Sequence, residues 1–359
     1  MTAAMTVLTE TPPGTVPSPA EMRRTLMRVS LASLARFAPS DGGIVARSLV
    51  RSDGQWATTE PSNLNTAEVL KALLLLQKHG VSTPFDPIPL LNRLVQHHLE
   101  TADYQVVSLS LWAAAIGGQR CAHLLWSLLK TRLPGAVTHS MGLAWVLCAL
   151  AEYAPMARDH RDVSELAHQM FDRLIVNQVS ATGLFRESAR REGWLRRRRV
   201  DALLSAQVYP ILALASFARR FAHGDAVARA VRCADRLCAL QGPLGQWWRR
   251  YDANQGTVFE TYPVYCVNQD ASAPGALGAL QETLGDTRYE ASIERGLGWE
   301  FGANELNLSL IDDAERVIAR AVESHEGNFS VDRELYAYQP ARCLVALLTN
   351  PRWASEVAS

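Results

Sequence analysis

About twelve helical patterns follow one another along this chain, and they constrain its fold more than any other feature does. In each pattern, apolar residues recur at three- and four-residue intervals, as on the buried face of an α-helix. No convincing run of alternating β-branched residues separates them, so the sequence predicts an all-α protein. The predicted helices are Met22–Phe37, Thr66–His79, Pro89–Thr101, Val107–Ile116, Ala122–Thr131, Met141–Tyr153, Val163–Asn177, Ala202–Phe221, Ala226–Leu240, Ala271–Leu284, Tyr289–Phe301 and Ala337–Leu348.

The connections between these helices also repeat, through a Gly-x-aromatic tripeptide. Glycine permits a tight turn after an outgoing helix, and the aromatic ring can fill the gap between neighbouring hairpins. Repeated helical hairpins without polar capping units favour a closed ring, so we expect an (α/α)6 toroid. The four copies are Gly54-Gln55-Trp56, Gly183-Leu184-Phe185, Gly245-Gln246-Trp247 and Gly327-Asn328-Phe329.

The ring is expected to form one domain spanning residues 21–359, after a disordered tail at 1–20 that is rich in Thr, Pro and Ala. Basic and acidic residues balance at 36 each, so no global charge recruits nucleic acid. Apolar runs such as Val69–Leu76 are short and interrupted by Lys71, which predicts no transmembrane segment. With no secretory signal pattern, a cytoplasmic location is expected.

Cysteine and histidine are scattered in ways that do not suggest a metal centre. The six cysteines occur at irregular spacings in helical context, which favours reduced, buried thiols. No His and Cys cluster has metal-ligand spacing, so we predict no metal site and no cofactor. Magnesium remains an alternative, since Asp252 and Asp270 could hold it through a bound diphosphate.

The segment Gln241–Ala273 gathers aromatic, cationic, amide and acidic side chains more densely than packing requires. A Trp-Arg-Tyr group suits stacking on a sugar ring or holding an anion beside an aromatic wall. Asp270, before a predicted helix, is the first acid candidate, and its alternative role is a helix cap. Glu260 could act with it as a second carboxylate. The predicted substrate-binding residues are Trp248, Arg249, Tyr251, Tyr262, Tyr265, Asn268 and Gln269.

The pattern Gln241-x-x-x-Gly245-x-Trp247 resembles the QW motif of terpenoid cyclases and protein prenyltransferase subunits, which share an α/α toroid. Gln178 begins a looser copy of it. The resemblance implies an isoprenoid substrate in an aromatic-lined cavity with an acidic catalyst. Class II cyclases use an Asp-x-Asp-Asp motif, and the stretch Leu310-Ile311-Asp312-Asp313 matches it incompletely, which makes Asp313 a third catalytic candidate. The alternative for Asp312 and Asp313 is the first turn of a helix. The zinc ligands of a prenyltransferase are not evident.

Three functions therefore stay open at this point. The first is a terpenoid-cyclase-like enzyme that uses Asp270 or Asp313. The second is a glycan-active lyase, hydrolase or epimerase on an anionic, uronic-acid-type polysaccharide, using Glu260, Tyr262 and Asp270, because glycan-active (α/α)6 barrels also carry Gly-x-Trp turns. The third is a non-catalytic binding toroid in a polysaccharide or isoprenoid pathway. The arginine-rich stretch Arg190–Arg199 is either a solvated loop or a rim patch for a polyanion.

Overall fold

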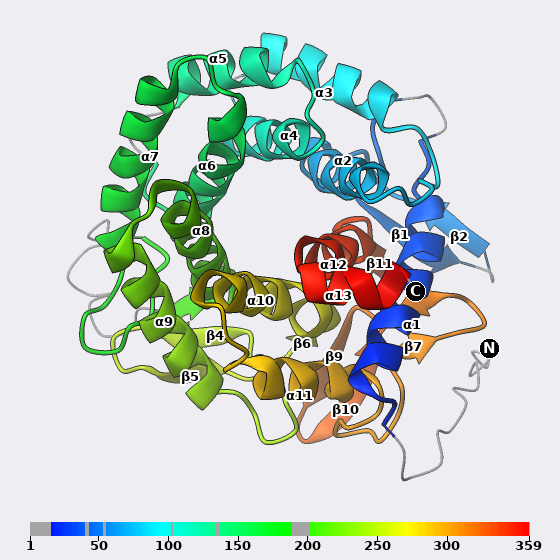
Figure 1. Cartoon of the computed structure of the whole chain (residues 1–359). Coiled ribbons are helices and arrows are strands. Elements are labelled where there is room, and N and C mark those ends of the chain that lie inside the picture. The colour runs from blue at the N-terminus through cyan, green and yellow to red at the C-terminus, as the bar shows by residue number, and fades with distance from the viewer. Residues whose placement is uncertain are drawn as a thin grey trace.

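The computed structural model describes residues 16–39, 43–52, 55–101, 103–133, 137–188 and 201–358, and these form a closed double ring of helices (Figure 1). Successive inner helices contact one another, and α12 contacts α2, which closes the ring. The predicted (α/α)6 toroid is therefore confirmed. The inner helices are α2 (Asn63–Lys78), α4 (Tyr104–Ile116), α6 (Ser140–Tyr153), α8 (Ser205–Phe221), α10 (Ala273–Leu284) and α12 (Tyr338–Thr349). The outer helices are α1 (Pro19–Ala35), α3 (Pro87–Glu100), α5 (Ala122–Arg132), α7 (His160–Ile175), α9 (Gly224–Ala239) and α11 (Glu290–Glu300).

Each of these helices corresponds to one that the sequence pattern predicts, and a further helix, α13 (Pro351–Ala358), follows α12. Local signals set several boundaries. The Asp103 side chain accepts hydrogen bonds from the first free N–H groups of α4, and Ser18 forms a capping box with Glu21 at the start of α1. Gly285 adopts a left-handed conformation that ends α10.

Inner and outer helices differ in how much of their surface they bury. Every residue of α4 from Val106 to Ile116 is buried, whereas α7 buries only one stripe that includes Val163, Met170 and Leu174. An inner helix packs against neighbours on both sides and against the outer ring, while an outer helix has one face in water. The amphipathic pattern is therefore strongest in the outer ring.

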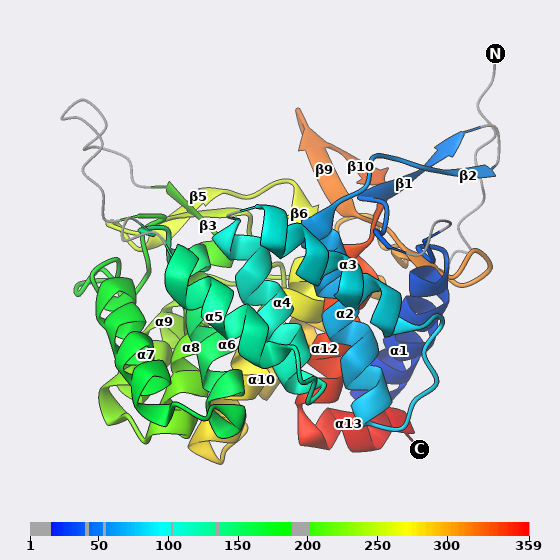
Figure 2. The ribbon, with the colours of Figure 1, turned by 90° about the horizontal axis from the view of Figure 1, so that it is seen from above.

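Short strands gather at one end of the ring, and α13 lies at the other (Figure 2). They form three three-stranded sheets, in the orders β11-β1-β2, β10-β9-β6 and β3-β4-β5, and a β7-β8 pair. The sequence does not reveal these strands, because strands this short show no alternation of apolar and polar residues. The strands are β1 (Ser48–Ser52), β2 (Gln55–Thr58), β3 (Asp201–Leu203), β4 (Arg250–Asp252), β5 (Thr257–Glu260), β6 (Val264–Tyr265), β7 (Ile311–Asp312), β8 (Val317–Ile318), β9 (Ala321–His325), β10 (Asn328–Asp332) and β11 (Leu335–Tyr336).

Two of the repeated connections share one geometry, which a glutamine organises. Gln241 Nε2 donates to the carbonyl of Gly245, at 2.9 Å, and to that of Ser292 in α11, at 2.8 Å. Gln178 Nε2 makes the same pair of bonds, to Gly183 at 2.9 Å and to Arg229 in α9 at 3.0 Å. The QW-like motif is thus a device that fastens a turn to the next outer helix.

A second glutamine then holds the aromatic residue that ends each turn. Gln269 accepts from the N–H of Trp247 and donates to its carbonyl, and Gln207 does the same for Phe185. Both aromatic residues are completely buried, as expected for a plug between hairpins. The other copies differ: Gly327 lies in the turn between β9 and β10, and Gly54 lies outside the described residues.

Candidate functional site

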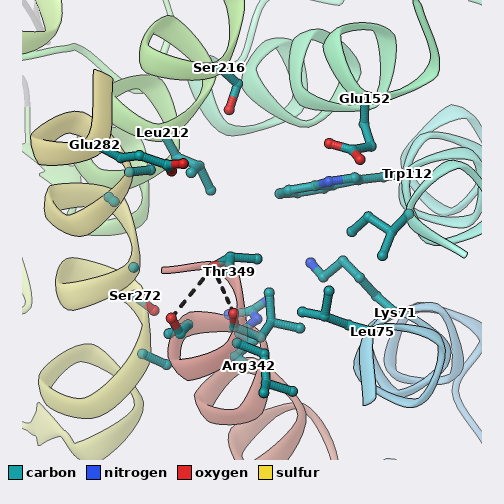
Figure 3. Close-up of a pocket in the computed structure, with 18 of the residues that line it drawn as sticks. Lys71, Leu75, Trp112, Glu152, Leu212, Ser216, Ser272, Glu282, Arg342 and Thr349 are labelled. Carbon is teal, nitrogen blue, oxygen red and sulfur yellow. Dashed lines mark hydrogen bonds between the residues drawn. The ribbon is translucent and has the colours of Figure 1, made fainter. Parts of the chain in front are cut away.

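A cavity of about 330 Å³ lies inside the ring and extends to the carboxyl ends of the inner helices (Figure 3). All six inner helices contribute to its lining, together with the start of α13. It therefore opens toward the end of the ring that lies opposite the strands. The lining residues are Lys71, Leu75, Lys78, His79, Trp112, Ile116, Glu152, Val208, Tyr209, Leu212, Ser216, Arg219, Ala271, Ser272, Gly275, Ala276, Ala279, Glu282, Arg342, Val345, Ala346, Leu348, Thr349 and Pro351.

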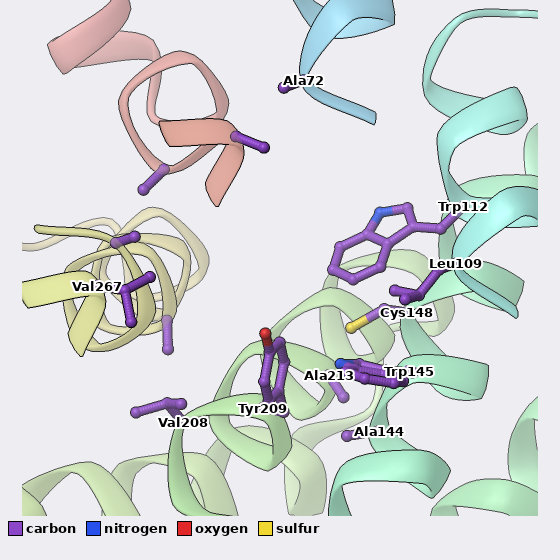
Figure 4. Close-up of a cluster of buried hydrophobic side chains, with 14 of the residues drawn as sticks. Ala72, Leu109, Trp112, Ala144, Trp145, Cys148, Val208, Tyr209, Ala213 and Val267 are labelled. Carbon is purple, nitrogen blue, oxygen red and sulfur yellow. The ribbon is translucent and has the colours of Figure 1, made fainter. Parts of the chain in front are cut away.

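Aromatic side chains from three consecutive inner helices stand in the ring interior (Figure 4). Trp112 on α4 and Tyr209 on α8 line the cavity. Trp145 on α6 is 2% exposed and meets Tyr209 edge to face, with 5.5 Å between ring centroids. These rings give the cavity a rigid apolar base, which is typical of sites that orient a ligand by a few polar groups.

Three charged side chains form a buried cluster at this base. The Glu68 carboxylate accepts from Arg342 Nη2 at 3.0 Å and lies 2.8 Å from Lys71 Nζ. Lys71 Nζ also lies 4.0 Å from the ring centroid of Trp112, and the Arg342 guanidinium lies over Tyr209 at 5.6 Å. The exposed fractions of the Glu68 and Lys71 side chains are only 1% and 4%. Two cations thus share one carboxylate.

The charges of this cluster stabilise one another. Burial by itself would raise the pKa of Glu68, but the positive charges of Lys71 and Arg342 lower it to about 2. Burial would lower the pKa of Arg342, yet the neighbouring Tyr209 and Glu68 leave it raised. Glu68 therefore stays ionised and Arg342 stays charged over the whole working range of a protein.

Two more carboxylates reach the cavity nearer its mouth (Figure 3). Glu282 on α10 is held by Arg219 at 2.5 Å. Glu152 on α6 forms no ion pair or side-chain hydrogen bond within the part of the chain that the structure describes. Glu152 lies beside the Trp112 ring and is half-buried, so its carboxylate is available to a ligand.

Asp270, the first catalytic candidate from the sequence, lies behind the cavity wall. It belongs to a π-helical turn, Asn268–Ser272, whose last two residues, Ala271 and Ser272, line the cavity. Asp270 itself is 3% exposed, and its charge raises the pKa of Glu300 of α11. Burial raises its pKa well above the usual range, and contact with the Cys343 thiol opposes this only in part. Since successive helical residues point in different directions, neighbours of Asp270 face the cavity while it does not.

Glu260 and Tyr262, which the sequence joined to Asp270, lie at the strand-bearing end of the ring. Glu260 pairs with Arg249 and Arg250, each at 3.3 Å. The Tyr262 hydroxyl donates to Glu305, which also accepts from other side chains of this region. Both groups therefore already have partners at this end of the ring.

The other predicted binding residues surround the same connection. Trp248 is buried and meets Tyr262 edge to face, and Tyr251 is completely buried. The Gln269 side chain is hydrogen-bonded to the Trp247 backbone, and the Arg320 guanidinium lies over the ring of Tyr265. Asn268, in the π-helical turn, is half-buried. None of the predicted site residues lines the cavity, so their catalytic and binding roles stay untested predictions.

The remaining predictions fall on the outside of the ring or outside the described residues. Asp313 lies in the β7–β8 turn, where it pairs with Arg28 at 2.7 Å, with 65% of its side chain exposed. The expected helix after Asp312 and Asp313 is wrong, because this stretch forms a strand pair. Arg190–Arg199 lies outside the described residues. Within the described ranges, no group of three or more His, Cys, Asp or Glu residues could hold a metal, and no helix is long and apolar enough to cross a membrane.

Sequence reasoning missed the residues that line the cavity, although one signal for them was present. Glu68 and Lys71 interrupt the apolar run of α2, and Arg342 interrupts that of α12. A charge inside a helix that is apolar on every side must be paired or functional, because an unpaired buried charge is costly. That pattern pointed to the ring interior, whereas the density of aromatic residues pointed to a connection.

No protein-family model and no curated protein matches this chain. Solved structures do resemble it. An unsaturated glucuronyl hydrolase from Bacillus sp. GL1 has a TM-score of 0.66 at 13% identity, covering 92% of this chain and 97% of that one. A sugar epimerase from a ruminal bacterium has 0.66 at 10%, covering 92% and 98%. A family 88 glycosyl hydrolase from Bacteroides vulgatus has 0.60 at 11%, covering 93% and 99%.

These similarities establish the fold and correct the family expected from the sequence. The structures named above are glycan-active enzymes and not terpenoid cyclases, so the terpenoid-cyclase family and the isoprenoid substrate are wrong. The physical reason is the role of the QW-like motif. Gln241 and Trp247 fasten a turn that any ring of helical hairpins can use, whatever ligand the ring binds. The chain therefore has the (α/α)6 toroid fold that these glycan-active enzymes share.

Proposed function

We propose that this protein is a glycan-active enzyme that binds an acidic sugar in the cavity inside its ring. One observation carries the proposal: the Glu152 carboxylate, the Trp112 indole and the cations Lys71 and Arg342 line the same cavity. An indole suits the apolar surface of a sugar ring, and the cations suit its carboxylate. Glu152 supplies a group that can move a proton.

The reaction belongs to one of three types: hydrolysis, elimination or epimerisation of a uronic-acid residue. Each requires proton transfer at or beside the sugar ring, and a carboxyl group within reach can act as the acid or the base. Positive charge beside the sugar carboxylate stabilises negative charge that develops there in elimination and epimerisation. Glu152 is the proposed acid or base, and Lys71 and Arg342 are the proposed electrostatic partners.

The similar solved structures support this proposal by their names, which include glucuronyl hydrolases, a sugar epimerase and a polysaccharide lyase. The proposal also agrees with the glycan alternative that the sequence left open. It moves the chemistry from the Gln241–Ala273 connection to the ring interior.

One assay separates the three reactions. The protein is incubated with unsaturated glucuronyl oligosaccharides, saturated polyuronates and matched neutral oligosaccharides. Loss of ultraviolet absorbance from the unsaturated sugar reports hydrolysis, and a gain from a saturated polyuronate reports elimination. A change in the nuclear magnetic resonance spectrum without either reports epimerisation. Turnover of the acidic sugars alone is expected, and absence of all three signals would favour the non-catalytic binding toroid.

The variant Glu152→Gln tests the acid or base. Loss of proton transfer should lower kcat about 100-fold or more, while binding of the substrate is retained. Glu165→Gln is the matched control, because Glu165 lies on outer helix α7 with 56% of its side chain exposed. Unchanged turnover in Glu152→Gln would remove this residue from the mechanism.

A further inference from the structure

Lys71 is an unusual choice of cation for this protein. The sequence contains three lysines against 33 arginines, and two of those lysines, Lys71 and Lys78, line the cavity. The two residue types are not equivalent, because a lysine ammonium is a compact point charge and an arginine guanidinium is a broad planar fork. Lysine inside the ring therefore has a role that arginine, the more frequent cation of this chain, does not serve.

The hydrogen bonds of the buried cluster leave donors for a ligand. Glu68 Oε1 accepts from both Arg342 Nε and Nη2, at 3.2 and 3.0 Å. Arg342 Nη1 has no hydrogen-bond partner among the described residues, although Arg342 lines the cavity. Lys71 Nζ has three N–H groups and one anionic neighbour, Glu68. Both cations can therefore donate into the cavity while they remain paired.

The positive and negative charges of the cluster do not balance. Glu68 neutralises one of the two cations, and Arg219 and Glu282 neutralise each other nearer the mouth. Glu152 and Lys78, which also line the cavity, carry opposite charges, so one net positive charge remains. The two cations of the base lie beside the rings of Trp112 and Tyr209. An uncompensated charge is costly in a site largely excluded from water, and a bound anion removes that cost.

We infer that Lys71 and Arg342 form a receptor for a single carboxylate, with Glu68 holding the two cations in place. The inference rests on the proposed function for the identity of its ligand, the carboxylate of one acidic sugar residue. It adds the residues that select an acidic sugar over a neutral one. It also predicts that the base of the cavity binds a single negative charge.

Calorimetric binding of monosaccharides tests the receptor without any turnover. Wild-type protein is titrated with glucuronate, with glucose and with inorganic sulfate. Glucuronate should bind more tightly than glucose and than sulfate, because it carries both the charge and the sugar ring. Equal binding of glucuronate and glucose would overturn the inference, and sulfate binding as tightly as glucuronate would reduce the site to a general anion site and overturn its assignment to a sugar carboxylate.

Two substitutions at one position locate the effect. Lys71→Met should weaken glucuronate binding about tenfold or more and leave glucose binding unchanged. Lys71→Arg should weaken glucuronate binding to a smaller but measurable extent, because the planar guanidinium keeps the charge and does not reproduce the compact ammonium. Lys130→Met is the matched control, because Lys130 pairs with Asp162 on the outer ring. Circular dichroism checks that each variant folds, and Lys71→Arg keeps the test decisive if Lys71→Met does not fold. Glucuronate binding that survives both changes unaltered would overturn the receptor. Because turnover is not measured, failure of the proposed enzyme activity would leave this result interpretable by itself.

Discussion

Gln269 holds Trp247 by both of its backbone polar groups: its carbonyl accepts from the Trp247 N–H at 3.1 Å, and its amide donates to the Trp247 carbonyl at 3.3 Å. The two residues are separated by the whole connection that includes β4, β5 and β6. These two hydrogen bonds, the clasp, fasten Trp247 at the end of the Gly245 turn to the π-helical turn that precedes α10. They explain why the most distinctive sequence motif of the chain serves the fold.

Replacing Gln269 with Met should destabilise the protein by about 2–4 kcal/mol, because a buried N–H and a buried carbonyl lose their partners at once. Chemical denaturation measures this difference in the free energy of unfolding. Gln255→Met, at an exposed turn position, serves as the control and should change stability by less than about 0.5 kcal/mol. Equal stability of the two variants would show that the clasp does not hold the turn.

The turn itself depends on Gly245, which has a φ of 99°. A Cβ at this position would overlap the carbonyl oxygen of Arg295 in α11, so Gly245→Ala should cost more than about 3 kcal/mol. Gly285, with a φ of 71°, has open space around it, and Gly285→Ala should cost only about 1–2 kcal/mol for its backbone conformation. Thermal unfolding of Gly245→Ala and Gly285→Ala separates the cost of the backbone conformation from the cost of the overlap with the Arg295 carbonyl. Similar melting temperatures for both variants would contradict the close approach.

The buried carboxyl groups Asp270 and Glu300 predict how stability depends on pH. Burial raises the pKa of both well above their usual range, and the charge of Asp270 raises that of Glu300 further. Between the usual carboxyl pKa, about 4, and these raised values, the folded state binds more protons than the unfolded chain. The free energy of unfolding should therefore fall as pH rises through this window, and should carry no such penalty below it.

The variant Asp270→Asn removes one of the titrating groups, so its stability should fall less steeply with rising pH than that of the wild type. Ser272→Ala changes the same π-helical turn without removing a titrating group, and it should retain the wild-type slope. Denaturation at a series of pH values gives both slopes. If Asp270→Asn and the wild type run parallel, the pKa of Asp270 is not raised in the folded state.

Trp112 and Trp248 distinguish the ring interior from the connection as the binding site. Trp112→Phe should raise KM about tenfold by weakening contact with the sugar ring, a loss of about 1.4 kcal/mol. Trp248→Phe should leave KM unchanged, because Trp248 lies at the strand-bearing end and packs on Tyr262. Steady-state kinetics on an acidic oligosaccharide gives both values. A larger effect in Trp248→Phe would return the site to the Gln241–Ala273 connection.

The sequence was a good guide to the ring and a poor guide to its interior. Periodicity located all the helices of both rings because each buries a face against its neighbours, and Gly183 and Gly245 revealed their repeat. Periodicity cannot show which residues of two buried helices face the same cavity. Lys71 on α2 and Arg342 on α12 meet only because the ring closes, and they are 271 positions apart in the chain.

A crystal structure of Glu152→Gln with a bound unsaturated glucuronyl oligosaccharide would show directly where the sugar binds. The terminal sugar should lie in the cavity beside Trp112, with its carboxylate within hydrogen-bonding distance of Lys71 and Arg342. A sugar bound instead at the strand-bearing end, against Trp248 and Tyr262, would contradict this placement.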